Sequence, residues 1–353
     1  MNNTIIAGVG KYIPEWTVTN ADLEKVMDTS DEWIQERSGI VERHFIRPGE
    51  ETGATMAAKA SRIAIENAGI QPKDIDFIIF ATLSSDYFFP GNGVLLQREL
   101  GITETEIAAL DIRNQCSGFV YGLEVADQFI KTGKYKNILL VGSEYHSGGL
   151  DISTRGRGIS VLFGDGAGAV VLQPTNDNEK GILTTHIHSD GTNAEILSAI
   201  SPGMHGGYYS EDMDQFGFED NNGFRFVMVT EKMLKNAIVF PYMDGQTVFK
   251  TAVKKFPEVI IEALETTGYT TDQVKIVIPH QANLRISQFV QRILKLTDDQ
   301  MFNNIQKYGN TTAASIPIAL SEALEQGKIQ KGDLVMLAAF GSGFTWGSVL
   351  IRW

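Results

Sequence analysis

The chain has 353 residues, of which 43% are hydrophobic and 21% are charged, a balance typical of a folded globular protein. Its formal net charge of −13 argues against broad nucleic-acid binding, because the phosphate backbone would be repelled. The single cysteine excludes a disulfide framework and a multi-cysteine zinc site. With no basic signal-like start and no apolar run of roughly 20 residues, we expect a cytoplasmic protein without a membrane span.

Helix-like and strand-like segments alternate along the chain. Residues 3–9 are predicted to form a strand, Asn20 is predicted to cap a helix, and residues 28–34 begin a second helix. Residues 55–68 have amphipathic helical spacing, and the apolar run 75–81 is typical of a strand covered on both faces. The order of helix, glycine and buried strand then recurs, which predicts a largely parallel α/β architecture.

This recurrence is an internal repeat. Gly133 lies 17 residues after Cys116, and Gly327 lies 17 residues after Asn310. Both glycines end a helical segment that leads into a buried strand, so Cys116 and Asn310 hold equivalent positions. We therefore interpret the chain as two similar halves related by pseudo-symmetry.

The two halves are residues 1–175, which carry the cysteine, and residues 176–353. The second half contains extra sequence at about residues 202–245, rich in glycine, methionine and aromatic residues. Long insertions in compact domains are often functional loops or lids. A surface excursion or a dimer contact is the alternative interpretation of this segment.

Cys116 lies at the junction between strand-like and helix-like sequence. Apolar residues follow it at three- and four-residue spacing, so the cysteine is predicted to lie at a helix N-terminus. The positive end of the helix dipole favours thiolate, which predicts a lowered pKa and a nucleophilic thiol. A small buried hydrophobic residue without a chemical role is the alternative.

Two further residues are expected beside Cys116. Asn310 is predicted to head the helix that corresponds to the one after Cys116, and the two helix heads can face each other across a shared cleft. His280 follows the strand-like residues 275–278, at the carboxyl end where open α/β sheets place their ligands. A structural imidazole and a simple helix cap are the alternatives for His280 and Asn310.

At these positions the chain resembles the β-ketoacyl-acyl-carrier-protein synthase III family of the thiolase-like superfamily. The motifs that carry the resemblance are DTSDEWIQERSGIVERH (28–44), QCSG around Cys116, RGRGISVLFGDGAGAVVL (155–172), PHQANLRI (279–286), YGNTTAASIP (308–317) and AFGSGFTWGS (339–348). Their order and spacing extend over nearly the whole chain. The resemblance implies a thiolase-like five-layer αβαβα duplication of two similar halves, with mixed, mostly parallel sheets.

The resemblance also implies a reaction. An acyl group from acyl-CoA would be carried on Cys116 and joined to malonyl-acyl-carrier protein by a decarboxylative Claisen condensation, which begins fatty acid or related polyketide synthesis. Backbone amides of Cys116 and Ser342 would form an oxyanion hole, and the side chains of His280 and Asn310 would stabilise the enolate. No cofactor and no metal is implied.

Binding roles follow from the same resemblance. It assigns Trp33, Arg37, Arg157 and Asn283 to CoA and its pantetheine arm, and Phe89, Asn114, Gln115 and Phe340 to the acyl pocket. Phe89 is expected to reach the pocket of the partner subunit, which implies a homodimer. It assigns Lys250, Arg285 and Arg292 to docking of the acidic carrier protein; a solvated basic face is the alternative for this cluster.

Three features differ from the usual family pattern. Asn114 and Gln115 replace small apolar residues, Ser342 replaces a glycine, and the insertion is absent from the short members. Ser342 keeps the backbone amide, so we expect the oxyanion hole to persist. The insertion is the reason that we expect acyl chains longer than acetyl to be accepted.

Other functions are compatible with the sequence. They are head-to-head condensation of two acyl-CoAs, acyl transfer to a hydroxyl or amine, and a non-catalytic acyl-carrier-binding protein. Degradative thiolase chemistry is disfavoured, because it uses a second cysteine that this chain lacks. His186 and His188 have the spacing of a metal-binding pair, but only Asp190 is available as a third ligand, so an ordinary strand is expected.

Overall fold

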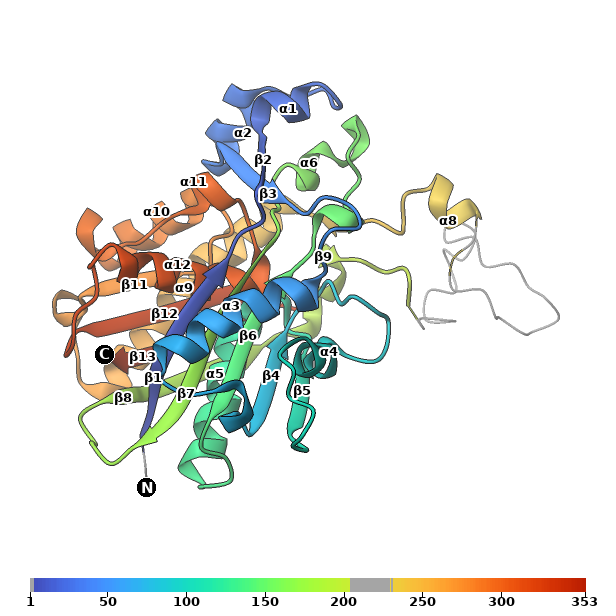
Figure 1. The fold of residues 1–353 in the computed structure, drawn as a ribbon. Coiled ribbons are helices and arrows are strands. Elements are labelled where there is room, and N and C mark those ends of the chain that lie inside the picture. Colours follow the sequence, from blue (N-terminus) through green and yellow to red (C-terminus); the bar gives the residue numbers. More distant parts are fainter. Residues whose placement is uncertain (1–2, 204–228, 230) are drawn as a thin grey trace.

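Two mixed β-sheets form the framework of the computed structural model, which describes residues 3–203, 229 and 231–353 (Figure 1). The first sheet has the strand order β1-β7-β6-β4-β5, with β1 Asn3–Tyr12, β4 Phe77–Ala81, β5 Ala108–Ile112, β6 Ile138–Glu144 and β7 Gly166–Thr175. The second sheet has the order β11-β12-β13-β8, with β8 Gly181–Ser189, β11 Ile276–Pro279, β12 Leu334–Gly341 and β13 Thr345–Arg352.

The two sheets share one topology. Strands β1, β7, β6 and β4 correspond in order to β8, β13, β12 and β11. A parallel bridge between Val277 and Met301 occupies the place where β4 pairs with β5 in the first sheet. This correspondence has the same order as the repeat read from the sequence.

The pairing within the sheets is mixed, as expected, but parallel pairs do not predominate. Strand β4 pairs in parallel with β5 and β6, and β11 with β12. The pairs β1–β7, β6–β7, β12–β13 and β13–β8 are antiparallel. Three residues link β12 to β13, and so short a connection can only join antiparallel neighbours.

Helices form the other three layers. Outside the first sheet lie α3 Gly53–Asn67 and α4 Asn92–Glu99; between the sheets lie α5 Gly118–Lys131 and α12 Ser315–Glu325; outside the second sheet lie α9 Gly245–Thr267 and α10 Leu284–Leu294. The central core combines Phe119 of α5 and Leu320 of α12 with Leu140 and Leu337 of the two sheets. The five-layer αβαβα duplication is therefore confirmed.

Short 3-10 helices connect the main elements. They are η1 Pro72–Asp74, η2 Gln115–Ser117, η3 Ser147–Gly149, η4 Thr154–Gly156, η5 Gly191–Ile196, η6 Thr271–Gln273, η7 Asp298–Gln300 and η8 Thr312–Ala314. Two of them, η2 and η8, occupy equivalent places in the two halves. Each of the helices η2 and η8 leads directly into a central helix, α5 or α12.

A smaller lobe covers one end of the sheets (Figure 1). It contains β2 Trp16–Thr19, β3 Glu42–Phe45, α1 Asn20–Glu24, α2 Asp31–Ser38, α6 Arg157–Ser160 and α11 Ile305–Tyr308. The predicted helix cap at Asn20 is wrong by one residue, because the Thr19 side chain accepts the Asp22 N–H instead. Asn20 is buried, and its amide donates to Asp31 and to the Ile40 carbonyl, so a tertiary contact has taken its side chain.

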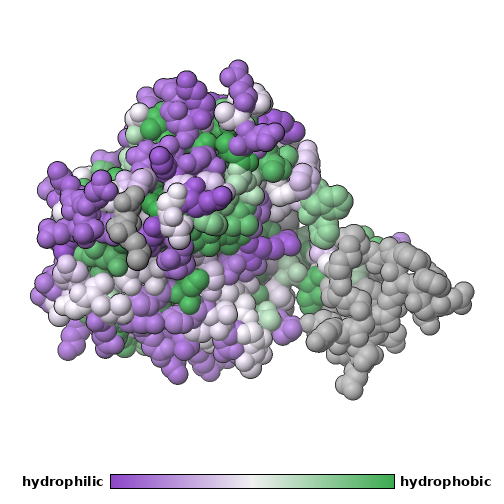
Figure 2. Space-filling model, turned by 90° about the horizontal axis from the view of Figure 1, so that it is seen from below, coloured by the Kyte–Doolittle hydropathy of each residue, from purple (hydrophilic) through white to green (hydrophobic). Residues whose placement is uncertain are grey.

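The predicted insertion lies largely outside the described residues, which omit 204–228 and 230. Its described parts contain α8 Glu231–Lys235 and the strand β10 Tyr242–Met243, which pairs with β9 Leu197–Ser198. None of the helices in the described part of the chain is long and apolar enough to cross a membrane. Hydrophilic side chains cover much of the face seen from below, with apolar ones interspersed (Figure 2).

Candidate active site

Two helix heads meet between the sheets. Cys116 lies in η2 ahead of α5, and Asn310 lies two residues before η8, which leads into α12. The heads are in close contact, because a Cβ added at Gly118 would lie 3.6 Å from the Cβ of Ala313. The structure thus brings together the two positions that the repeat made equivalent.

Cys116 is held tightly by the turn that follows β12. Its residue exposure is 9%, and a Cβ added at Gly341 would lie 2.5 Å from the Cβ and 3.1 Å from the Sγ of Cys116. The residue before the cysteine, Gln115, has φ +43°, a left-handed conformation that is unfavourable for a residue with a side chain. The thiol therefore lies on a sharp turn packed against a glycine.

The predicted lowering of the thiol pKa is wrong for the unliganded protein. Burial, together with the nearby Glu144 carboxylate, raises the pKa of Cys116 to about 12, although the amides of Ser342 and Cys116 act in the opposite direction. Relative to the ordinary value of 9.0 this is about 4 kcal/mol, whereas a helix terminus contributes about 0.3–1 kcal/mol. Burial therefore outweighs the helix dipole.

The same two amides, of Cys116 and Ser342, are those to which the resemblance assigned an oxyanion hole. Backbone N–H groups of Ser342 and Cys116 are directed at the sulfur. Two amides at this place are suited to hold the oxygen of a thioester carbonyl during attack by Cys116. The replacement of glycine by Ser342 leaves the backbone donor in place.

His280 follows β11 directly and is only 2% exposed. Its Nδ1 lies 2.7 Å from Ser315 Oγ, which also accepts the Gln281 N–H at 3.3 Å. We infer that the Ser315 hydroxyl donates its proton to Nδ1, an arrangement in which the ring proton lies on Nε2. Burial lowers the pKa of His280 to about 3, so the imidazole is neutral.

The Nε2 of His280 is buried and has no hydrogen-bond partner within the described residues. Buried polar atoms are almost always paired, so this nitrogen is suited to bond a substrate oxygen. Since His280 bonds to Ser315 at the head of α12, this donor belongs to the same junction as Cys116 and Asn310.

Asn310 is 6% exposed and is fixed at three points. Its backbone N–H donates to the Leu162 carbonyl at 2.8 Å, and its carbonyl accepts the Gly164 N–H at 3.1 Å. Its side-chain Oδ1 accepts the Thr312 N–H at 2.9 Å, which leaves Nδ2 as a donor. Asn310 and His280 thus each present a neutral N–H.

Two buried titratable residues near this junction were missed by the sequence analysis. Glu144 ends β6 and accepts hydrogen bonds from Ser84 Oγ at 2.6 Å and from the Ala313 N–H at 3.4 Å. Burial raises the pKa of Glu144 to about 7. His146, two residues further on, lies 2.7 Å from Thr312 through its Nε2. Both residues lie at the carboxyl end of the apolar strand β6. A polar residue at the carboxyl end of a buried strand is also the pattern that identified His280.

The residues assigned to CoA meet in the lobe. The guanidinium carbons of Arg37 and Arg157 lie 4.6 and 5.7 Å from the ring centroid of Trp33. Asn283 Nδ2 donates to the Arg37 carbonyl at 2.9 Å. Two guanidinium groups on one indole form a surface suited to stack a flat ring and to bind phosphate.

The residues assigned to carrier docking also lie together. Lys250 of α9 and Arg285 and Arg292 of α10 are exposed, and α9 packs on α10. The two arginines lie over Phe249 and Phe289, at 5.8 and 5.6 Å from the ring centroids. In the described part of the chain, no carboxylate within 4.0 Å pairs with any of the three cations.

Among the residues assigned to the acyl pocket, Gln115 of η2 and Phe340 of β12 lie on elements that pack against each other. Phe340 is buried in β12 and packs on Phe344, with 4.9 Å between centroids. Asn114 and Gln115 are half-buried, and Gln115 Nε2 donates to the Arg113 carbonyl. Phe89 is 81% exposed and so does not line a pocket of its own subunit.

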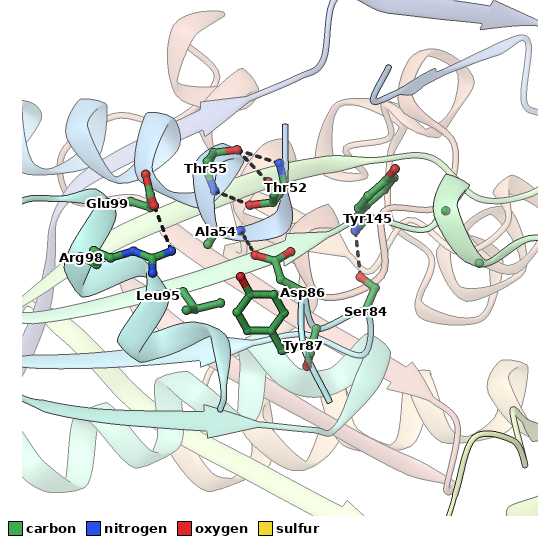
Figure 3. Close-up of a pocket in the computed structure, with 13 residues that line it drawn as sticks. Thr52, Ala54, Thr55, Ser84, Asp86, Tyr87, Leu95, Arg98, Glu99 and Tyr145 are labelled. Carbon is green, nitrogen blue, oxygen red and sulfur yellow. Dashed lines mark hydrogen bonds and ion pairs between the residues drawn. The ribbon is translucent and has the colours of Figure 1, made fainter. Parts of the chain in front are cut away.

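A polar pocket lies beside the Phe89 loop (Figure 3). Its wall includes Asp86, which accepts the N–H groups of Gly53 and Ala54 at the head of α3. Ser84 also lines it, accepting the Tyr145 N–H and donating to Glu144.

His186 and His188, the pair considered for a metal, both contact Glu262 instead, at 3.2 and 2.7 Å.

The duplicated five-layer fold defines a thiolase-like protein, and comparisons with known proteins identify its family. The model of 3-oxoacyl-[acyl-carrier-protein] synthase III matches residues 110–191, and the model of the C-terminal part of the same family matches residues 264–353. The chain belongs to the β-ketoacyl-[acyl-carrier-protein] synthase III family, as its motifs indicated, and is therefore a condensing enzyme of the acyltransferase type.

Individual relatives agree with this assignment. The chain is 43% identical over 348 residues to beta-ketoacyl-[acyl-carrier-protein] synthase III of Caldanaerobacter subterraneus subsp. tengcongensis, covering 99% of this chain and 97% of the relative. The crystal structure of the Aquifex aeolicus enzyme matches with a TM-score of 0.85 at 41% identity, covering 99% of this chain and 100% of the other. A priming β-ketosynthase of the R1128 polyketide pathway matches with a TM-score of 0.83 at 30% identity, covering 99% and 96%.

Proposed function

We propose that this protein condenses an acyl-CoA with malonyl-acyl-carrier protein to give a 3-oxoacyl-carrier protein, which starts fatty acid or related polyketide synthesis. The family assignment supports the reaction class. The observation that carries the mechanism is the buried Nε2 of the neutral His280, which has no partner among the described residues and belongs to the junction of Cys116 and Asn310.

Cys116 performs the first half-reaction. Its Sγ forms a bond to the acyl carbon, the bond from that carbon to the CoA sulfur breaks, and the thiol proton leaves with CoA as its thiol. The amides of Cys116 and Ser342 stabilise the oxyanion, and one such donor is typically worth about 3 kcal/mol of barrier height. Since burial disfavours free thiolate, we expect deprotonation to be coupled to thioester binding.

His280 and Asn310 act in the second half-reaction. The malonyl group loses CO2, and the electron pair passes to an enolate whose oxygen accepts the N–H groups of His280 Nε2 and Asn310 Nδ2. The enolate carbon then attacks the acyl carbon on Cys116, and the C–S bond breaks to release the thiolate. A neutral imidazole is a weak acid, so it holds the enolate without protonating its carbon.

The surface residues define the route of the substrates. We place the CoA nucleotide on Trp33, Arg37 and Arg157, with Asn283 along the pantetheine arm, and we dock the carrier protein on the cations of α9 and α10. A carrier of opposite charge is suited to exposed cations on an otherwise acidic protein. The scheme requires no cofactor, and its CoA substrate and single free cysteine fit the cytoplasm.

A homodimer completes the acyl pocket in this proposal. Phe89, extended from its own subunit, enters the pocket of the partner, where Asn114, Gln115 and Phe340 set the acyl group that Cys116 carries. The polar side chains before the cysteine and the insertion motivate our expectation that chains longer than acetyl are accepted.

Intact-protein mass spectrometry tests the proposal. The enzyme is incubated with acyl-CoAs of graded length and then with malonyl-carrier protein, beside a Cys116→Ala control. We expect an adduct that the control lacks and that is consumed when 3-oxoacyl-carrier protein forms. No adduct, or one unchanged in the control, would favour a non-catalytic carrier-binding protein. An adduct consumed only by a hydroxyl or amine acceptor would indicate acyl transfer, and one consumed by a second acyl-CoA would indicate head-to-head condensation.

A further inference from the structure

A second buried imidazole, His146, lies beside the active site without a role in the reaction described above. The residue is 6% exposed, and its Nε2 lies 2.7 Å from the hydroxyl of Thr312. Its ring also packs on Phe163, with 4.6 Å between the centroids. His146 therefore contacts two residues that are distant from it and from each other in the sequence.

Both contacts lead to Asn310. Thr312 donates its backbone N–H to Asn310 Oδ1 at 2.9 Å. Phe163 forms a parallel β-bridge with Asn310, whose N–H and carbonyl bond to the two residues that flank this phenylalanine. His146 thus supports Phe163, whose segment holds the backbone of Asn310, and Thr312, which holds the side chain of Asn310.

Thr312 needs such support. Its φ is +46°, in the left-handed region, which is a clear outlier for a β-branched residue. A residue in this conformation persists only when its surroundings enforce it. The contact between its hydroxyl and His146 Nε2 is the side-chain hydrogen bond that the structure shows for Thr312.

The orientation of the Asn310 amide decides which atom faces the substrate. A side-chain amide can present either its carbonyl oxygen or its NH2 group, and only the NH2 group can stabilise an enolate. The Thr312 N–H engages Oδ1 and so directs Nδ2 away from itself. Displacement of Thr312 would release this constraint.

We propose that His146 is a positioning residue for the condensation step, which holds Thr312 and Phe163 so that the Asn310 N–H faces the malonyl enolate. This inference rests on the proposed function. Burial and the nearby His280 lower the pKa of His146 to about 3, so the contact with Thr312 is between neutral groups. Acylation of Cys116 uses the amides of Cys116 and Ser342 and lies outside this chain of contacts.

Single-turnover kinetics of the two half-reactions test the role. We expect His146→Leu and Thr312→Val to slow transfer from acyl-Cys116 to malonyl-carrier protein by about tenfold, the effect of one lost hydrogen bond on an oriented group, with acylation changed less than about twofold. Thr312→Ser keeps the hydroxyl, and His146→Gln places an amide nitrogen near the position of Nε2, so both should retain most of the rate.

Two double variants separate positioning from general packing. The effects of His146→Leu and Thr312→Val should not multiply, because both remove the same bond. In an Asn310→Ala background, His146→Leu should have no further effect on condensation. The inference would be overturned if the two effects multiplied, or if His146→Leu still slowed condensation in the Asn310→Ala background. It would also be overturned if the variants slowed acylation as much as condensation.

Failure of the proposed function would look different, because the parent enzyme would then form no acyl adduct or would not extend it. Thermal unfolding of each variant provides the control for folding. If His146→Leu is unstable, the matched pair Thr312→Val and Thr312→Ser tests the role instead. Equal condensation rates in these two variants would show that the Thr312 hydroxyl is not used.

Discussion

Ser315 Oγ lies 2.7 Å from Nδ1 of His280, and this contact joins the head of α12 to the end of β11. We infer that the hydroxyl donates this bond and so sets the tautomer of a buried neutral imidazole, with the proton on Nε2, an atom that has no partner among the residues described.

Ser315→Ala should therefore slow condensation while leaving acylation of Cys116 nearly unchanged. We expect a loss of about tenfold, because the ring proton is no longer confined to Nε2. Nitrogen-15 NMR of the labelled imidazole should show one tautomer in the parent and a mixture in the variant. Ser321→Ala, another buried serine of α12, is the matched control. A single tautomer in Ser315→Ala would contradict the assignment.

Gly341→Ala should impair the first half-reaction. The added Cβ would lie 2.5 Å from the Cβ of Cys116, so the cysteine must move from beneath the oxyanion amides. A displacement of about 1 Å is expected to slow acylation about 100-fold, measured by the rate of adduct formation. Gly191→Ala, where a Cβ meets open space, should leave the rate unchanged. Equal rates in both variants would show that the turn adapts.

Glu144→Gln should alter the pH dependence of stability. Burial raises the pKa of Glu144 from 4.5 to about 7, so the folded state retains a proton that the unfolded chain has released. Stability contributed by this group is therefore unaffected below about pH 4.5, falls as pH rises from there to about 7, and stays low above it.

Chemical denaturation at pH 4.5 and pH 8 measures this effect. The glutamine does not ionise, so the free energy of unfolding of the variant relative to the parent should rise by about 3 kcal/mol between the two pH values. A pH-independent difference would show that Glu144 is not the titrating group.

Reversal of charge on α10 should weaken carrier binding. Arg285→Glu with Arg292→Glu is expected to raise KM for malonyl-carrier protein about tenfold, because two exposed cations that attract an acidic partner become repulsive. The effect should shrink at high ionic strength. Lys73→Glu, an exposed lysine of the first half, is the control, and adduct formation from acyl-CoA should not change. An equal rise of KM in the control would contradict docking at α10.

The sequence alone was sufficient to predict the internal repeat, the fold class and the family. Helix ends at glycine, buried apolar strands and their spacing are local patterns, so the equivalence of Cys116 and Asn310 follows from the order of residues along the chain. The expected place of His280 followed from the same reasoning, because the carboxyl ends of strands point to a common edge. The binding and catalytic roles of individual residues stay predictions that the experiments above address.

Tertiary structure decided the properties that depend on contacts between distant segments. The pKa of Cys116 reverses direction because Glu144 and the turn after β12 enclose the thiol, and no local pattern encodes that burial. Asn20 loses its cap role to Thr19 because its amide donates to Asp31 of α2 and to the Ile40 carbonyl. His146 acquires significance only through its contact with Thr312, 166 residues away. Sequence determines which residues favour which elements, whereas desolvation and hydrogen-bond partners arise only when those elements pack.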